Sequence, residues 1–517
     1  MGKYKWTTLE HNGVLFPPPY QPHNVPVIYN GVELRLSAEA EEAATMYAKY
    51  LDTDYIRNAT FRRNFWKDWR KILGRNHEIQ NLENVNFSLI QEYLNKQKEE
   101  KKLISKEEKD KQKELREKEE EPYKTAMLDG TAQPVGNFRI EPPGIFIGRG
   151  SHPLIGRIKK RIVPHDIIIN IGKEATVPPG NWYKVIHDRK VIWLAAWLDS
   201  ISGKMKYVWL GNKSSLKAES DKAKFDLARK LRKKVKHIRC ENYKLFSDPD
   251  PIKQQLAVAL YLIDKLAIRV GNEKNTDVQS DTVGTTTLLV SNIQLHDFNK
   301  ITLNFLGKDS IRYTNTVSVE PLVHMLLNKF IQNKTKDDQI FELINPTLLN
   351  KYLQSYMPNL TAKVFRTYNA SYTFQKELNK ISKKLEQPGI NAKDEFRNAN
   401  LKVAVLCNHQ KQVSKSFGKS IEAINNKIKE LRSKAKKSKN KESKRKIKEK
   451  IKALKNKKKL KSELKGVALQ TSLDNYIDPR ITVAFTKKNN LDLGDFFNKK
   501  MMEQFWWALD TPASFKF

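Results

Sequence analysis

The sequence predicts an α+β fold with more than one domain, and three observations lead to this prediction. The chain has 517 residues, which exceeds the usual size of a single hydrophobic core. Segments typical of strands gather between about residues 134 and 210, whereas apolar residues recur at helical spacing from residue 216 onward. A lysine-rich segment, 413–466, repeats apolar residues at spacings of three and four, which indicates a helical hairpin.

Residues 1–215 are expected to mix helices and strands. The run FRRNFWKDWRKIL at 61–73 predicts an amphipathic helix with basic and aromatic side chains. Segments rich in β-branched and aromatic residues predict three strands, separated by turn residues, at 166–170, 191–197 and 206–210.

Residues 91–121 are almost wholly polar. Such a run favours a long exposed helix supported by charged pairs four residues apart, with disorder as the main rival.

Residues 216–412 are predicted to be mainly helical, with one strand pair at 302–306 and 310–313. Lys308 lies in the Gly-Lys-Asp turn that joins these strands. A lysine at a hairpin tip is ordinarily just solvated.

In the segment 413–466 the apolar residues predict an antiparallel hairpin with a polar turn near 438–443. Its lysine excess either only keeps the hairpin soluble or serves weak contact with DNA. The second is favoured, because like charges on one hairpin destabilise it unless an anion lies nearby. The apolar positions of the hairpin are Ile421, Ile424, Ile428, Leu431, Ile447, Ile451 and Leu454.

Residues 467–517 are expected to form a small helical tail.

The charge balance indicates a nucleic-acid partner. A formal net charge of +37 with a pI of about 9.8 favours binding to a polyanion. The two cysteines, Cys240 and Cys407, lie in unrelated settings without the spacing of a zinc site, which favours a reduced, intracellular protein. No apolar stretch is long enough to span a bilayer, and no phosphate-binding loop of an ATP-driven motor is found.

Five residues in distinctive settings combine into one chemistry. They are Arg269 in KLAIRVGNEK, Lys308 in FLGKDS, Arg366 in AKVFRTYNAS, His409 in LCNHQ and Tyr476 in NYIDPR. A phenol, two guanidiniums, an ammonium and an imidazole supply what attack on a phosphodiester requires without metal: a nucleophile, fixed positive charge for the extra charge on phosphorus, and an acid for the leaving oxygen.

These segments resemble those of eukaryotic nuclear-type DNA topoisomerases of class IB, which are relatives of the tyrosine recombinases. The resemblance runs from about Trp6 to Phe517 and includes EHNGVLFPPPYQP, GRGSHP, DTVGTTTL and DPRITVAF. It implies a bilobed DNA clamp with a mixed α/β cap lobe (1–215), a mainly helical catalytic core (216–412), an antiparallel coiled-coil linker (413–466) and a small helical C-terminal domain (467–517).

The resemblance also implies a role for each candidate residue. Tyr476 would be the nucleophile that forms a 3′-phosphotyrosyl bond, Arg269, Arg366 and His409 would stabilise the transition state, and Lys308 would be the general acid. Neither ATP nor metal would be required. The positions that match family residues near DNA are Arg149, His152, Asn272, Lys274, Thr282, Asp309 and Asn475.

From the same resemblance we expect a nuclear enzyme that acts as a monomer on double-stranded DNA and responds to camptothecin-type inhibitors. Two departures from the family pattern, Ile147 in place of an arginine and Leu473-Asp474 before the nucleophile, bear on that drug response. The long charged N-terminal extension typical of the family is absent from this sequence, because the resemblance begins almost at Met1, so the chain is either a trimmed form or a naturally compact enzyme. Import into the nucleus would then rest on internal clusters such as 444–446 and 455–461.

Two other functions share parts of this pattern. A site-specific tyrosine recombinase would use the same catalytic set, and a basic chromatin-binding protein could retain the fold without activity. Relaxation of a plasmid that has no recognition site, and a covalent protein–DNA adduct, would separate these functions.

Overall fold

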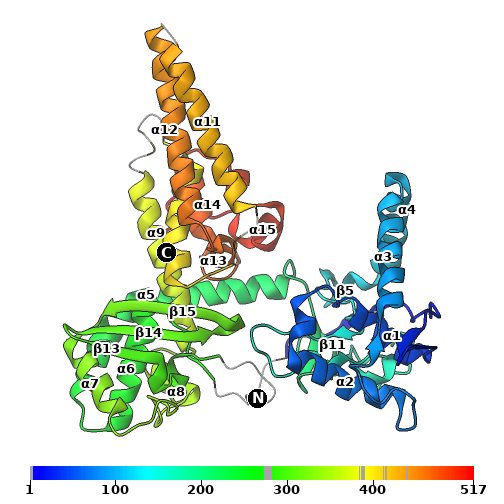
Figure 1. Cartoon of the computed structure of the whole chain (residues 1–517). Coiled ribbons are helices and arrows are strands. Elements are labelled where there is room, and N and C mark those ends of the chain that lie inside the picture. Colours follow the sequence, from blue (N-terminus) through cyan, green and yellow to red (C-terminus); the bar gives the residue numbers. More distant parts are fainter. Residues whose placement is uncertain are drawn as a thin grey trace. The chain divides into compact units, whose positions relative to one another are not determined.

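The computed structural model describes residues 4–272, 282–382, 385, 390–411, 413, 416–437 and 440–517, with only the backbone of Asp309 and Lys441 (Figure 1). The chain divides into two compact units. The first contains Met1–Lys217, and the second contains Ala218–Glu273 and Thr282–Phe517. Helices and small sheets occur in both units, which confirms the predicted α+β class. The boundaries predicted at residues 412 and 466 stay predictions.

Part of the first unit is built around an aromatic core. In α2 (Ala59–Leu73) the side chains of Phe61, Phe65 and Trp69 recur every four residues and are completely buried, so the predicted amphipathic helix is confirmed. The Asn58 side chain accepts hydrogen bonds from the first-turn amides of α2. The neighbouring elements are α1 (Ala38–Ala48), β2 (Val27–Tyr29), β3 (Val32–Leu34) and β4 (Val85–Asn86).

The single long helix predicted for 91–121 is wrong. Two helices, α3 (Ser88–Leu103) and α4 (Lys106–Glu120), occupy this region and are separated at Ile104. The side chain of Ser105 accepts a hydrogen bond from the Glu108 amide at 3.1 Å, so it caps a new helix and ends the old one.

The rest of the first unit is a set of sheets. One of them has the strand order β10-β9-β11-β12, in which β9 and β10 are parallel and the other pairs antiparallel. Its strands β9, β11 and β12 confirm the three predicted ones, and Ile167, Ile169 and Val208 are fully buried on one face. The strands are β1 (Leu9–His11), β5 (Thr125–Leu128), β6 (Thr131–Pro134), β7 (Gly144–Ile145), β8 (Ile158–Lys159), β9 (Ile167–Asn170), β10 (Lys184–Ile186), β11 (Trp193–Leu198) and β12 (Met205–Trp209).

The second unit is mainly helical, as predicted. Its large apolar core surrounds the buried helix α6 (Pro251–Leu266) and includes one antiparallel sheet of β13, β14 and β15. A short 3-10 turn, Lys308–Ser310, joins β14 to β15, so the predicted strand pair with Lys308 at its tip is confirmed. The elements are α5 (Ser215–Lys244, which begins in the first unit), α7 (Pro321–Ile331), α8 (Pro346–Tyr356), α9 (Ala362–Ser382), α10 (Ala392–Leu406), β13 (Ile293–His296), β14 (Lys300–Gly307) and β15 (Ile311–Ser318).

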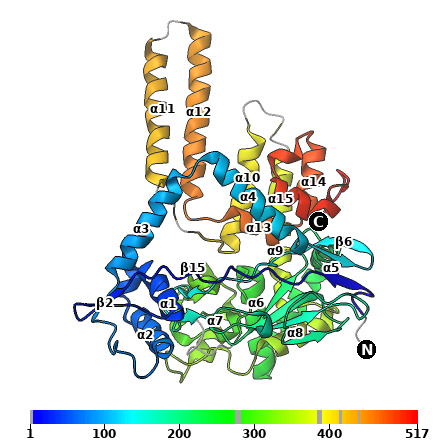
Figure 2. The ribbon, with the colours of Figure 1, turned by 90° about the vertical axis from the view of Figure 1, so that its right-hand side faces the viewer.

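The lysine-rich segment forms the predicted antiparallel hairpin. Helices α11 (Phe417–Lys437) and α12 (Lys441–Glu463) lie side by side in both views (Figures 1 and 2). The predicted turn at 438–443 is too long, because α12 already begins at Lys441, where Asn440 caps it through the Glu442 and Ser443 amides. Three helices follow: α13 (Leu469–Asn475), α14 (Pro479–Lys488) and α15 (Lys499–Gln504). None of the helices in the described ranges combines the length and the apolar character that crossing a membrane requires.

Two glycines allow the segment after α6 to pack directly against residues 282–287. Gly271 has a φ of +87°, and a Cβ atom on Gly284 would overlap the Gly271 backbone and lie 2.9 Å from the Arg269 carbonyl oxygen. The amide of Thr285 donates to that same carbonyl at 2.9 Å. The backbone of Arg269 is therefore held by a contact that only glycine permits.

We expect Gly284→Ala to lower the midpoint of thermal unfolding by a few degrees, equivalent to about 1–3 kcal/mol, because the methyl group overlaps backbone that has no room to move. Gly418→Ala is the matched control, since among the described residues no atom beyond its chain neighbours and its own helix backbone lies within 4 Å of the added carbon. Equal midpoints for the two variants would contradict this close packing.

Candidate active site

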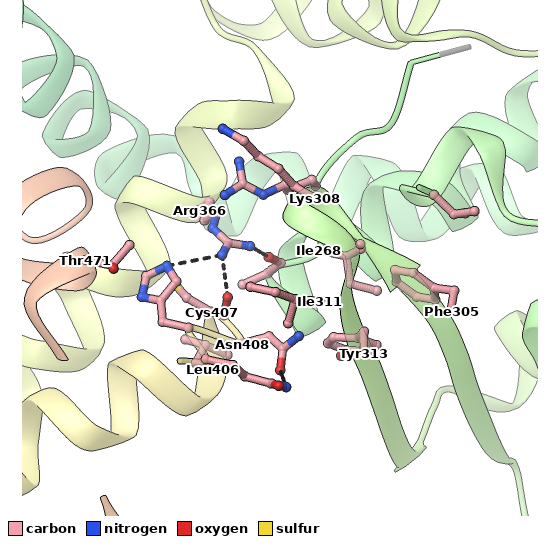
Figure 3. Close-up of a pocket in the computed structure, with 16 residues that line it drawn as sticks. Ile268, Phe305, Lys308, Ile311, Tyr313, Arg366, Leu406, Cys407, Asn408 and Thr471 are labelled. Carbon is pink, nitrogen blue, oxygen red and sulfur yellow. Dashed lines mark hydrogen bonds between the residues drawn. The ribbon is translucent and has the colours of Figure 1, made fainter. Parts of the chain in front are cut away.

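An open cavity of about 150 Å³ in the second unit is lined by four of the five predicted catalytic residues (Figure 3). Arg269, Lys308, Arg366 and His409 all line it. They come from the segment after α6, the β14–β15 hairpin, α9 and the segment after α10. Four groups that lie up to 140 residues apart in the chain thus face one cavity.

Arg366 is the most constrained of the four. Its side chain is buried, and its two terminal nitrogens donate to the carbonyl oxygens of Ala267 and Cys407. Ala267 presents its carbonyl from a left-handed conformation (φ +50°) at the end of α6. Within the described part of the chain, the Nε atom of Arg366 has no hydrogen-bond partner. The guanidinium is thus fixed in place while it retains donor capacity for an anion.

His409 is buried beside Arg366. The Nε2 atom lies 3.3 Å from Arg366 Nη2, and Nδ1 lies 2.8 Å from the hydroxyl of Ser472. Burial, with Arg366 and Arg269 nearby, lowers the pKa of His409 to about 3. The imidazole is therefore neutral near pH 7, and it can act as a hydrogen-bond donor but not as a cation.

Tyr476 lies against these two residues at the C-terminal end of α13. Its ring centroid is 5.2 Å from that of His409, and the guanidinium carbon of Arg366 lies 4.9 Å from it. The Tyr476 amide donates to the Ser472 carbonyl at 2.9 Å, and the Tyr476 carbonyl accepts a hydrogen bond from the hydroxyl of Ser371 at 2.9 Å. The structure thus brings the phenol to the basic groups that sequence reasoning grouped with it.

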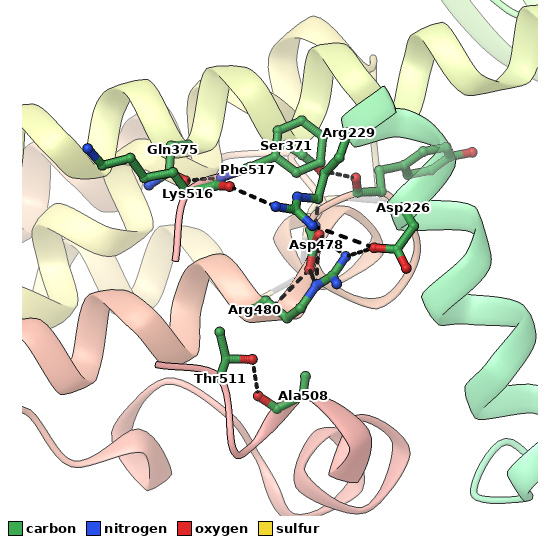
Figure 4. A network of polar contacts seen from close by, with 11 residues as sticks. Asp226, Arg229, Ser371, Gln375, Asp478, Arg480, Ala508, Thr511, Lys516 and Phe517 are labelled. Atoms are coloured by element: carbon green, nitrogen blue, oxygen red, sulfur yellow. Dashed lines mark hydrogen bonds and ion pairs between the residues drawn. The ribbon is translucent and has the colours of Figure 1, made fainter. Parts of the chain in front are cut away.

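A buried polar network holds the backbone just after Tyr476 (Figure 4). Asp478 is fully buried, and its amide donates to the Ser371 hydroxyl at 3.0 Å. Its carboxylate accepts hydrogen bonds from Arg480, whose Nη2 atom also lies 2.8 Å from Asp226 of α5. Sequence reasoning gave no role to these residues, although an Asp-Pro pair signals the start of a helix, here α14.

The structure describes only some of the residues that are predicted to contact DNA. Thr282 is buried beside the β14–β15 hairpin, and the amide of the following residue, Val283, donates to the Leu306 carbonyl at 2.7 Å. Asn475 is exposed, and its side-chain amide donates to the Thr471 carbonyl. Asn272 is exposed. Lys274 and the side chain of Asp309 lie outside the described residues.

Two further predicted DNA contacts belong to the first unit. His152 packs edge-on against Phe146 and accepts a hydrogen bond from the Leu154 amide, and burial lowers the pKa of His152. Arg149 lies between two glycines in left-handed conformations, Gly148 and Gly150. The backbone therefore bends at Arg149.

The chain matches three family models in order. They are the eukaryotic DNA topoisomerase I DNA-binding fragment over residues 4–210, the eukaryotic DNA topoisomerase I catalytic core over 213–442, and the C-terminal topoisomerase domain over 448–517. DNA topoisomerase 1 beta of Arabidopsis thaliana is 45% identical over 550 residues, covering 100% of this chain. DNA topoisomerase 1 of Homo sapiens is 42% identical over 546 residues, covering 98% of this chain and 71% of the human protein. The chain spans 60% of the length of the Arabidopsis relative.

Proposed function

Because the chain belongs to the eukaryotic DNA topoisomerase I family, we propose that it is a type IB DNA topoisomerase. It relaxes positive and negative supercoils by cutting one strand of duplex DNA, letting the strand rotate and rejoining it. The observation that carries the proposal is the contact of the Tyr476 ring with Arg366 and His409, beside a cavity that Arg269 and Lys308 also line.

In the proposed cleavage step the scissile phosphate enters the cavity. The Tyr476 oxygen forms a bond to phosphorus and loses its proton to solvent, while the bond from phosphorus to the 5′ oxygen breaks. Lys308 donates a proton to that leaving oxygen, which would otherwise depart as an unfavourable alkoxide. The products are a 3′-phosphotyrosyl bond and a 5′ hydroxyl, and rejoining reverses every transfer. The covalent bond conserves the phosphodiester energy, so neither ATP nor a metal ion is needed.

Three groups stabilise the charge that builds on the phosphate oxygens. Arg366, fixed by the carbonyl oxygens of Ala267 and Cys407, needs no reorganisation when the phosphate arrives. Arg269 is exposed on the same cavity wall and supplies a second guanidinium. His409 contributes a neutral donor.

The Ser472 hydroxyl can set which nitrogen of His409 carries the proton. Arg366 Nη2 can only donate, so while it is bonded to Nε2 the imidazole proton resides on Nδ1, which donates to the Ser472 hydroxyl. Once a phosphate takes up Arg366, the hydroxyl can donate to Nδ1 instead, and the proton then resides on Nε2. Only that tautomer donates from Nε2 to a phosphate oxygen. Ser472 is therefore a positioning residue that acts through His409.

We expect Ser472→Ala to slow DNA cleavage about tenfold without weakening DNA binding, because one buried hydrogen bond that orients the imidazole is lost. Single-turnover cleavage of an oligonucleotide measures the rate. In a His409→Ala background the same substitution should change nothing further. Equal effects in both backgrounds would give Ser472 a purely structural role.

A plasmid without any recognition sequence tests the proposed activity. We expect relaxation in excess EDTA without ATP, and a covalent protein–DNA adduct when the reaction is stopped with denaturant. Dependence on a specific site would indicate a recombinase, and binding without an adduct would indicate a non-catalytic chromatin protein. Loss of relaxation in EDTA that magnesium restores would contradict metal-independent cleavage.

The remaining family expectations belong to the same proposal. The enzyme acts as a monomer on duplex DNA in the nucleus, and camptothecin-type compounds bind to its cleaved complex with DNA. Ile147, Leu473 and Asp474, where the sequence departs from the family pattern, bear on that drug response.

A further inference from the structure

A second cavity in the second unit, of about 640 Å³, is separate from the residues of the proposed reaction. It lies where α5 meets α14 and the last residues of the chain (Figure 4). Asp226 is the one carboxylate side chain among its lining residues. The cations that line it are Arg229, Lys230, Arg232, Lys233, Arg480 and Lys516.

Two carboxylate side chains near this cavity, those of Asp226 and Asp478, are already engaged. Asp226 accepts a hydrogen bond from Arg480 at 2.8 Å and lies 3.8 Å from Arg229. The buried Asp478 is bound by Arg480 on both carboxylate oxygens. These two carboxylates thus pair with Arg229 and Arg480.

The outer cations have no such partner in the described part of the chain. Among the described residues, neither Lys230 nor Lys233 forms an ion pair, and the Arg232 guanidinium lies over the Tyr372 ring at 5.6 Å. Like charges crowded into one concave surface repel one another and create a strongly positive potential. This cavity therefore favours an anion that neutralises several cations together.

The spacing of the cations selects the kind of anion. Lys230 and Lys233 are three residues apart on α5, which separates them by roughly 4.5 Å along the helix axis. Lys516 lines the same cavity from the last residues of the chain. An anion with charges distributed along its length can reach cations on both sides, and its oxygens can accept charge-assisted hydrogen bonds from each.

We propose that this cavity binds a small polyphosphate, the chemistry shared by inorganic tripolyphosphate and the triphosphate tail of a nucleotide. The bound anion removes the repulsion between α5 and the C-terminal segment, and so strengthens the attachment of that segment. The effect extends toward Tyr476, because Arg480 binds Asp478, and Asp478 and Tyr476 share the Ser371 hydroxyl. The site is thus a regulatory one that stabilises the segment carrying the proposed nucleophile.

Calorimetric titration of the full chain with tripolyphosphate, in the absence of DNA and magnesium, tests the proposal. We expect saturable binding that Lys230→Gln/Lys233→Gln weakens at least about tenfold. The matched control, Lys336→Gln/Lys351→Gln, removes two exposed lysines of the same unit and should bind tripolyphosphate normally. ATP, whose triphosphate carries one charge fewer than tripolyphosphate, should bind saturably but more weakly, while adenosine should not bind.

A thermal unfolding series checks the stabilising effect. Tripolyphosphate should raise the unfolding midpoint of the parent protein and of the control above that in sodium chloride of equal ionic strength, but not that of Lys230→Gln/Lys233→Gln. Non-saturable binding, equal losses in both double variants, or binding of adenosine would overturn the proposal. So would displacement of tripolyphosphate by a short DNA duplex, since the surface would then be a further DNA contact.

Discussion

Tyr476→Phe is expected to abolish both the covalent adduct and plasmid relaxation, a loss of at least about 10⁴-fold. The substitution removes only the oxygen that bonds to phosphorus. The ring retains its packing against His409 and its position next to the Arg366 guanidinium. The backbone retains its hydrogen bonds to Ser371 and Ser472. Affinity for duplex DNA should therefore stay close to that of the parent protein.

Tyr372→Phe is the matched control for this prediction. It also removes one phenolic oxygen from the second unit, but Tyr372 lies on α9 with an exposed side chain that stacks on Tyr368. Its adduct yield and relaxation rate should equal those of the parent protein. A residual adduct in Tyr476→Phe, located by digestion and mass spectrometry, would reassign the nucleophile to another residue.

Sequence reasoning predicted well those features that depend on local pattern. Phe61, Phe65 and Trp69 recur at helical spacing, and the hairpin of α11 and α12 follows from its apolar repeat. The strands on either side of Lys308 follow from β-branched residues around a glycine turn. These predictions succeed because each element carries its signal within its own segment.

The grouping of the five site residues came from a different source. Spacing alone does not bring Arg269, Arg366 and Tyr476 together, since they lie on separate elements of the second unit. The resemblance to a family grouped them, and the structure then shows Arg366 held by two carbonyl oxygens and His409 neutral through burial. Such constraints depend on tertiary packing and leave no periodic trace in the sequence.

The features that sequence reasoning missed also depend on single contacts and on tertiary packing. The interruption between α3 and α4 depends on a single side chain, Ser105, whose capping hydrogen bond outweighs the helical preference of the charged residues around it. The network of Asp226, Asp478 and Arg480 joins residues 254 positions apart. Neither feature follows from composition or periodicity.

Lys308→Ala is expected to slow cleavage of an ordinary DNA strand by about 10²- to 10⁴-fold, because the 5′ oxygen then leaves without a proton from a positioned acid. Lys308 lies at the turn between β14 and β15, so its removal leaves the paired strands and the cavity residues Arg269 and Arg366 in place. A substrate with sulfur at the 5′ bridging position should be cleaved at nearly the parental rate, since a thiolate leaves without protonation.

Comparison of the two substrates separates acid catalysis from simple charge stabilisation. A lysine that only attracts the phosphate would be needed equally for oxygen and for sulfur, so equal slowing on both substrates would remove Lys308 from the acid role. Lys300→Ala is the matched control, because it removes the same charge from the far end of β14. Its cleavage rates on both substrates should match those of the parent protein, which would show that the position of Lys308, and not the net charge of the hairpin, determines the protonation of the leaving oxygen.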